Sequence, residues 1–147
     1  MSTRLKSYLT TKFEIKDLWS LKYFLGIEVA RSRHGVFISQ RKYVLDLLEE
    51  TGMLGCKACD TPIEPNQKLS DGDSGAAVEK GRYQRLVGKL IYLSYTQPDI
   101  AFAVSVVSQF MHAPCEAHLE AVFQILRYLK SSPGKGLFFA KHIHLRV

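Results

Sequence analysis

The chain has 147 residues, of which 46% are hydrophobic, 23% charged and 11% aromatic, and its formal net charge is +6. This composition is typical of a globular protein, and it excludes a wholly disordered chain, a collagen-like chain and a disulfide scaffold. No uncharged apolar run reaches the roughly 18 residues of a membrane span, and the N-terminus has no apolar signal core, so we expect an intracellular protein, cytoplasmic or nuclear.

The charge is distributed in three blocks. Residues 1–52 carry nine Lys/Arg against six Asp/Glu, which gives +3, and residues 53–79 carry two against five, which gives −3. Residues 80–147 carry nine against three, which gives +6. A basic block is the electrostatic footprint of a polyanion partner, although it is also compatible with a solvated surface that keeps the chain soluble.

The first forty residues predict a short helix followed by a β-hairpin. Residues 5–9 fit one face of a helix, and residues 13–17 form a strand-like stretch. Residues 21–30 alternate with the period of two that is typical of a strand, and residues 36–39 return as a second strand. Gly35, in the turn between them, supplies the positive φ that a tight turn often needs.

A helix follows the predicted hairpin, and an irregular segment follows the helix. Ser39 suits the N-cap, because its hydroxyl can accept from a free backbone N–H in the first turn. Gly52 is placed to end the helix as a C-terminal cap. Residues 53–79 look irregular, and the Ser/Asp/Gly-rich run at 70–75 is the best linker candidate. The apolar stripe of this helix consists of Tyr43, Val44, Leu47 and Leu48.

The last third of the chain predicts three helices and two closing strands. The helices fall near residues 81–95, 100–111 and 116–129, and Pro98 stands at a permitted first-turn position of the second. This second helix is apolar nearly all round, so we expect it at the centre of a helical cluster. Residues 136–140 and 143–147 look like strands of a small C-terminal β-hairpin.

Together these elements predict an α+β fold in three parts. Residues 1–69 hold the N-terminal hairpin with its helices, residues 70–79 form a linker, and residues 80–147 form a helical unit that ends in the small hairpin. The linker has little apolar surface to bury, so we expect it to join two separate units.

Two kinds of chemistry find little support in the sequence. Cys56 and Cys59 form a C-x-x-C pair, and His112, Cys115 and His118 recur at spacings of three, but about fifty residues separate the groups, so ordinary thiols are favoured over zinc. The acidic residues are scattered and no Asp-Asp pair stands in an apolar strand, where two-metal phosphoryl chemistry would need one. We therefore assign no catalytic residue and no metal ligand.

A row of cations is the better candidate site. Arg82, Arg85 and Lys89 lie at i, i+3 and i+7 on one helix face, which we place opposite the apolar stripe, and Tyr92 continues the row. Cations beside an aromatic ring on a rigid face can hold a phosphate backbone and stack a base. A solvated face of an amphipathic helix explains the same spacing equally well.

Many short blocks of the sequence resemble the reverse transcriptase of copia-type LTR retrotransposons, in the order of that family. They include Phe24-Leu25-Gly26 with its flanking residues, Asp60-Thr61-Pro62, Arg85-Leu86-Val87-Gly88-Lys89-Leu90, Gln97-Pro98-Asp99-Ile100 and Leu126-Arg127-Tyr128-Leu129-Lys130. The resemblance covers nearly the whole chain. It implies the end of the polymerase palm, the primer-grip hairpin and the thumb and connection region of a Pol polyprotein.

The resemblance also implies what lies outside this chain. The family's Tyr-x-Asp-Asp hairpin, whose carboxylates hold two Mg²⁺, comes shortly before the segment that matches Phe13, and its ribonuclease H domain begins after the segment that matches Val147. Both regions are expected partners of this chain. The expected cofactor of the intact parent is Mg²⁺, and for this chain alone we expect no cofactor.

The family's nucleic-acid contacts transfer to positions that match its motifs. The primer-grip positions are Lys22, Phe24, Leu25 and Gly26, where the absent side chain of Gly26 lets a primer strand approach the backbone. The thumb helices from Gly81 onward would grip a template–primer duplex without reading its sequence. Three hypotheses remain: an incomplete polymerase that at most binds template–primer, a stand-alone nucleic-acid-binding module, and an inactive structural remnant.

Overall fold

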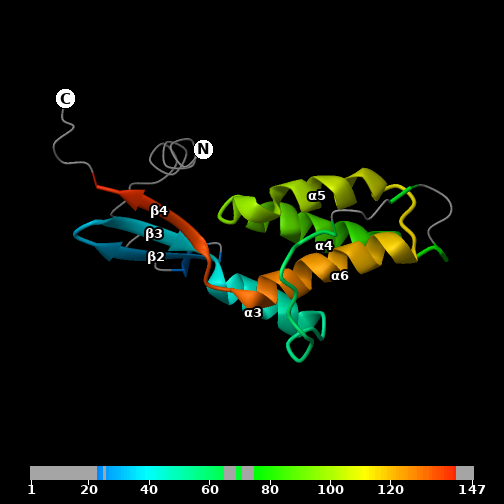
Figure 1. Cartoon of the computed structure of the whole chain (residues 1–147), viewed down its shortest axis with the longest axis horizontal. Coiled ribbons are helices and arrows are strands. Elements are labelled where there is room, and N and C mark those ends of the chain that lie inside the picture. Colours follow the sequence, from blue (N-terminus) through cyan, green and yellow to red (C-terminus); the bar gives the residue numbers. More distant parts are fainter. Residues whose placement is uncertain (1–22, 25, 65–68, 71–74, 142–147) are drawn as a thin grey trace.

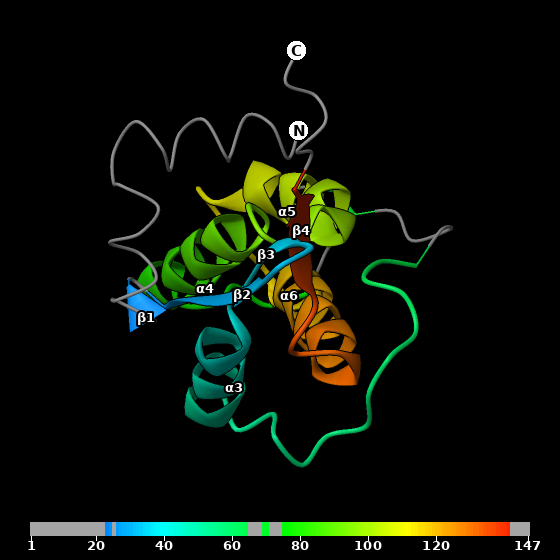
Figure 2. The same cartoon turned by 90° about the vertical axis from the view of Figure 1, so that its left-hand side faces the viewer.

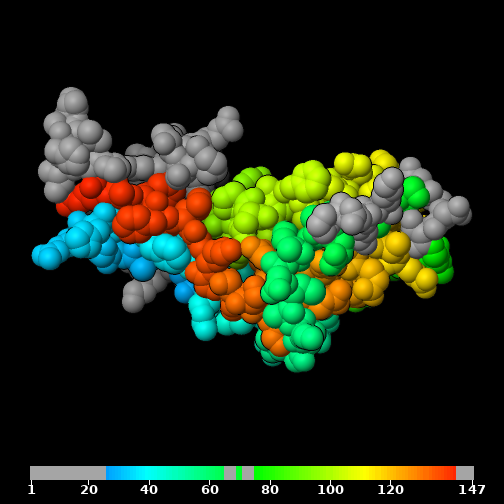
Figure 3. All heavy atoms as spheres, viewed as in Figure 1, coloured from blue at the N-terminus to red at the C-terminus, as the bar shows by residue number. Residues whose placement is uncertain are grey.

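A computed structural model of the chain describes residues 23–24, 26–64, 69–70 and 75–141. The helix expected at residues 5–9 and the strands expected at 13–17 and 143–147 therefore lie outside the described residues. Within the described ranges, no helix is long and apolar enough to cross a membrane. The fold is α+β, with a small sheet at one end of the molecule and helices at the other (Figures 1 and 3).

The sheet is antiparallel, with the strand order β1-β2-β3-β4. Its strands are β1 (Tyr23–Phe24), β2 (Ile27–Ser32), β3 (Gly35–Ser39) and β4 (Gly136–Ala140). The expected single strand at 21–30 is wrong, because the chain reverses within it and β1 pairs with β2. Gly26 has a φ of +80°, a left-handed conformation that only glycine adopts at low cost. The period of two continues across this reversal and therefore does not reveal it.

β4 pairs with β3, whereas the second strand of the expected C-terminal hairpin, residues 143–147, lies outside the described residues. In this pairing Ile38 lies opposite Leu137. Gly35 has a positive φ of 155°, as expected. Its missing side chain has a second role, because a Cβ there would lie 2.2 Å from the carbonyl oxygen of Phe139. The turn glycine thus also allows β4 to approach β3.

Helix α3 (Arg41–Glu50) follows β3 directly. Its N-cap is Gln40 and not the expected Ser39, because Ser39 is the last residue of β3 and pairs with both neighbouring strands. The Glu28 carboxylate, from β2, accepts the backbone N–H of Lys42 at 2.7 Å and satisfies one of the helix's free donors. At the other end Gly52, with a φ of +72°, terminates the helix as expected.

Three further helices follow the irregular segment. They are α4 (Lys80–Leu93), α5 (Ala101–Val107) and α6 (Glu116–Ser131), and α5 is flanked by the 3₁₀ turns η1 (Pro98–Ile100) and η2 (Ser108–Phe110). Glu79 caps α4, since its carboxylate accepts the backbone N–H groups of Gly81 and Arg82. Figure 2 shows α3, α4, α5 and α6 grouped around one centre.

One apolar core joins all four helices. Val44, Leu47 and Leu48 of α3 pack in the same cluster as the buried residues of α4, α5 and α6. The expectation that the second helix of the last third lies at the centre of this cluster is wrong. One side of α5 faces solvent, and Phe102 on that side is 69% exposed.

A segment before the expected linker and a residue within it are both attached to α6. The backbone N–H of Cys59 donates to the carbonyl of Arg127, and the N–H of Glu116 donates to the carbonyl of Ala76. The expected linker, residues 70–79, therefore connects two parts of the chain whose helices share one apolar core and whose strands share one sheet. The division into separate units at this segment stays a prediction.

Candidate functional site

Tyr43 connects the turn between β1 and β2, which contains Gly26 and which we call the hairpin tip, to the helices. It stands in the first turn of α3, and its ring lies against Gly26, where a Cβ would come within 2.9 Å of the Tyr43 Cδ1 atom. The family resemblance predicts that a primer strand approaches this glycine, and that role stays a prediction. In the structure the glycine is required by its positive φ and by the tyrosine ring beside it.

Tyr43 begins a row of three aromatic rings, which we call the tyrosine row: Tyr43, Tyr92 and Tyr95. The Tyr43 and Tyr92 ring centroids are 5.3 Å apart and those of Tyr92 and Tyr95 are 6.4 Å apart, both in edge-to-face geometry. Tyr43 is half-buried, and burial raises the pKa of its hydroxyl. Tyr95 is 59% exposed, so the row runs from the hairpin tip out to solvent.

A buried hydrogen bond keeps the two helices that carry the row in register. The hydroxyl of Thr96, just after α4, donates to the Gln40 side-chain oxygen at the start of α3 over 2.7 Å. Both side chains are 1% exposed. Because water cannot compete at such a site, this contact positions Tyr43 against Tyr92.

The three cations of the predicted row have different surroundings. The Lys89 Nζ atom lies 2.8 Å from the Glu50 carboxylate of α3, so it is already ion-paired within the fold. The Arg82 guanidinium lies 5.7 Å from the ring centroid of Phe123, which packs against the core. Arg85 is exposed and makes no hydrogen bond or ion pair with the described residues. Arg82 and Lys89 therefore flank the apolar face and do not lie opposite it.

The structure brings part of the predicted site together. Gly26 and Tyr92 both lie against the Tyr43 ring, although 66 residues separate them in the sequence. Burial raises the pKa of the Tyr43 hydroxyl, and the positive charge of Lys89 lowers it by a smaller amount. Lys22 and Leu25 lie outside the described residues, and of Phe24 only the backbone in β1 is described. Tyr43 and Glu50 also belong to this surface, and the sequence-based site did not include them. Their spacing of seven on one helix was the available signal, since it places both on the same face.

The cysteine and histidine groups form no metal centre within the described ranges, where no cluster of three or more metal-ligating side chains occurs. His118 has a structural role. It is fully buried, stacks on Phe110 and accepts the backbone N–H of Cys115 at Nδ1, while Nε2 lies 2.9 Å from the carbonyl oxygen of Ser70. Both ring nitrogens therefore have a hydrogen-bond partner, and the histidine attaches Ser70, within the irregular segment, to α6.

Comparison with known proteins assigns relatives to this chain. The family model described as reverse transcriptase (RNA-dependent DNA polymerase) matches residues 1–65. The chain is 46% identical over 133 residues to the retrovirus-related Pol polyprotein from transposon RE1 of Arabidopsis thaliana, and 41% identical over 133 residues to that from transposon RE2. These alignments cover 90% of this chain and 9% of each polyprotein.

A shorter relative is an uncharacterized mitochondrial protein of Arabidopsis thaliana, 37% identical over 139 residues, of which the alignment covers 58%. The chain thus spans about a tenth of the two polyproteins and more than half of this shorter protein. No solved structure matches the chain.

Proposed function

This chain belongs to the reverse transcriptase family of retrovirus-related Pol polyproteins, and from that premise we propose that it holds a template–primer duplex without reading its sequence. The proposed surface consists of the Gly26 turn, the tyrosine row and the exposed side of α4 with Arg85. Its ligand is the sugar–phosphate backbone, which carries no direct sequence information.

One observation carries the proposal. The Tyr43 ring lies against Gly26 and 5.3 Å from the Tyr92 ring, so the hairpin tip and the cationic helix contribute to one continuous surface. A duplex extends over many phosphates, and a surface built from several elements can contact it over a longer stretch than one helix can. The charge of +6 over residues 80–147, nine Lys/Arg against three Asp/Glu, supports the same class of ligand.

The proposal assigns no polymerase activity to these 147 residues. The sequence contains no two adjacent aspartates, and two-metal phosphoryl transfer needs carboxylates that share Mg²⁺. We expect primer extension on a homopolymer template, with Mg²⁺ or Mn²⁺, to stay at the level of a blank without protein. Incorporation that survives rigorous purification would contradict this assignment.

The binding test is a salt titration of a labelled RNA–DNA hybrid followed by fluorescence anisotropy. Each phosphate that a Lys or Arg neutralises contributes about −0.9 to the slope of log K against log salt on a B-form duplex. The double variant Arg82→Gln/Arg85→Gln should therefore flatten the slope by up to about two such increments. The matched control is Lys57→Gln/Lys141→Gln, which removes two exposed cations that lie elsewhere.

The result separates the proposal from the inactive-remnant hypothesis. If both double variants bind the hybrid with the parent slope, the α4 cations are only a solvated face. If both weaken binding equally, the chain attracts polyanions through its net charge and has no defined surface. Either result would refute the proposed function.

A further inference from the structure

The two faces of the sheet have different compositions. Because side chains alternate along a strand, Ile38 and its neighbours lie on one face, where they form an apolar cluster. The other face carries Ala30, Phe37 and Phe138, among small residues such as Ser39. This second face is only partly covered, since Phe138 is 50% exposed and Phe37 is half-buried.

Phe37 and Phe138 form an aromatic pair on this face. They are direct cross-strand partners in the β3–β4 register, so their side chains project from the same face of the sheet, where the end of the Phe138 ring lies over Gly35. Ala30 is the partner of Phe37 on β2, and its methyl group leaves the edge of that ring open. We call the two phenylalanines the aromatic platform, and the small side chain of Ala30 lies opposite Phe37 on β2.

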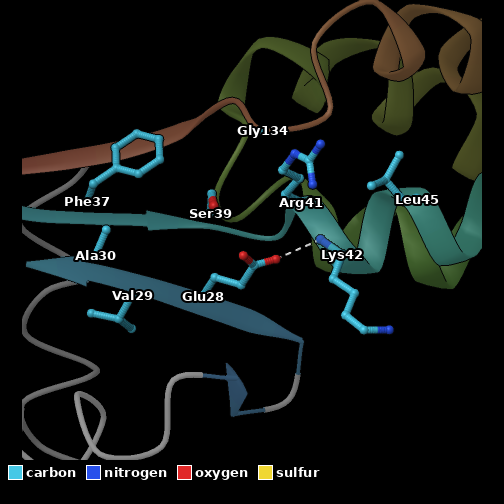
Figure 4. Close-up of a pocket in the computed structure, with 9 residues that line it drawn as sticks. All are labelled: Glu28, Val29, Ala30, Phe37, Ser39, Arg41, Lys42, Leu45 and Gly134. Carbon is cyan, nitrogen blue, oxygen red and sulfur yellow. Dashed lines mark hydrogen bonds between the residues drawn. The ribbon is translucent and has the colours of Figure 1, made fainter.

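A groove of about 640 Å³ extends from Phe37, the platform residue that lines it, to the N-terminus of α3 (Figure 4). Phe37, Ala30 and Ser39 line it on the sheet side, and Arg41 and Lys42 line its helical end. The one acidic residue of the lining, Glu28, is occupied because its carboxylate accepts the backbone N–H of Lys42. Arg41 is exposed and makes no hydrogen bond or ion pair with the described residues, so its guanidinium N–H groups can donate to an anion.

We propose that this sheet face is a second nucleic-acid site, one that takes an unpaired nucleotide of a single strand, with its base on Phe37 and Phe138 and its phosphate at Arg41. Aromatic rings on an open sheet stack on unpaired bases, and a neighbouring cation follows the backbone. The site lies on residues other than those of the proposed duplex surface and does not depend on it.

The chemistry of the groove favours a single strand over other ligands. A duplex offers no free base face to an aromatic platform, because its bases are stacked on each other. A proline-rich peptide can pack on aromatic rings, but it brings no phosphate for Arg41. The aliphatic part of Arg41 lies beside Gly134, where a Cβ would come 3.4 Å from the Arg41 Cδ atom.

The test uses the full chain and a short fluorescein-labelled oligothymidylate, with anisotropy as the measurement. In the variant Phe37→Leu/Phe138→Leu the side chains stay apolar and the planar rings are lost. We expect it to weaken oligothymidylate binding by about tenfold. The matched control is Phe102→Leu, which removes an exposed ring that belongs to α5 and does not line the groove, and this variant should bind as the parent does.

A second variant tests the phosphate contact without touching the platform. Arg41→Gln should flatten the salt slope for the oligothymidylate by about 0.7, the value for one phosphate of a single strand. Lys80→Gln, another exposed cation, is its control and should leave that slope unchanged. Circular dichroism and thermal unfolding show whether each variant keeps the fold. Because Arg41 is exposed, its variant remains informative if the double leucine variant unfolds.

The outcomes separate this site from the duplex surface. The proposal holds if Phe37→Leu/Phe138→Leu and Arg41→Gln both weaken binding of the single-stranded oligothymidylate and leave hybrid-duplex binding unchanged. It is overturned if folded Arg41→Gln keeps the parent slope, if Phe102→Leu weakens binding as much as the leucine pair, or if a proline-rich peptide binds the face and the oligonucleotide does not. If only the Arg82→Gln/Arg85→Gln variant loses duplex binding, that result tests the proposed duplex surface and says nothing about this site.

Discussion

Removing the acidic partner of Lys89 should strengthen duplex binding. Glu50 holds the Lys89 ammonium at 2.8 Å, and this contact competes with any phosphate that approaches the same cation. Glu50→Gln keeps the size and polarity of the side chain and removes its charge. The variant therefore makes Lys89 available to the proposed duplex surface.

The size of the effect follows from the geometry of the pair. At 2.8 Å the attraction of two unit charges is about 1.5 kcal/mol in a water-like dielectric, before side-chain entropy and salt reduce it. The side chains of Lys89 and Glu50 are 29% and 45% exposed, so the net worth of the pair is at most about 1 kcal/mol. Duplex affinity at low salt should rise by up to about fivefold, and the salt slope should steepen by up to about 0.9.

Fluorescence anisotropy with a labelled hybrid duplex measures both quantities across a salt series. Glu49→Gln is the matched control, because it changes the net charge equally at the adjacent residue. The Glu49 carboxylate makes no hydrogen bond or ion pair within the described part of the chain. Glu50→Gln should exceed Glu49→Gln in both affinity and slope. Equal values for the two variants would refute the reasoning, since only general charge would then matter.

Three other expectations concern the fold. Gly26→Ala should lower the free energy of unfolding in urea by about 1–2 kcal/mol, because alanine must adopt a φ of +80° and displace the Tyr43 ring; unchanged stability would contradict the described turn. Burial raises the pKa of Tyr83, whose hydroxyl donates to the Val107 carbonyl, so the folded chain binds this proton more tightly than the unfolded chain does. Stability should therefore be full below the unfolded pKa near 10 and fall as the pH rises above it, and in Tyr83→Phe this fall should be smaller. Limited proteolysis should cut first within residues 70–76, and first cuts inside α5 would contradict the predicted linker.

Local patterns in the sequence predict most of the helices correctly. The apolar spacing over α3, α4 and α6 follows the helical period, and the residues it places inward, such as Val44, Leu90 and Val122, are fully buried. Gly52 ends α3 as its position indicates. These features depend on neighbours within one or two turns, so a single segment contains the information that determines them.

Contacts between distant segments decide what the patterns do not. The reversal at Gly26 leaves the alternation of residues 21–30 unchanged, and Ser39 is not the helix cap because it pairs in the sheet. The apolar composition of α5 gives no sign that Phe102 is exposed, since exposure depends on which helices cover it.

The candidate sites show the same division. Residue type and spacing are local properties, and they identify the cations of α4, the aromatic residues and the family's motifs. The folded chain is needed to place Tyr43 between Gly26 and Tyr92, to pair Lys89 with Glu50, and to set Phe138 opposite Phe37 on the neighbouring strand. The reason is physical: a contact between remote residues forms when the core and the sheet close around both of them, and no local pattern specifies which remote segment the partner will come from.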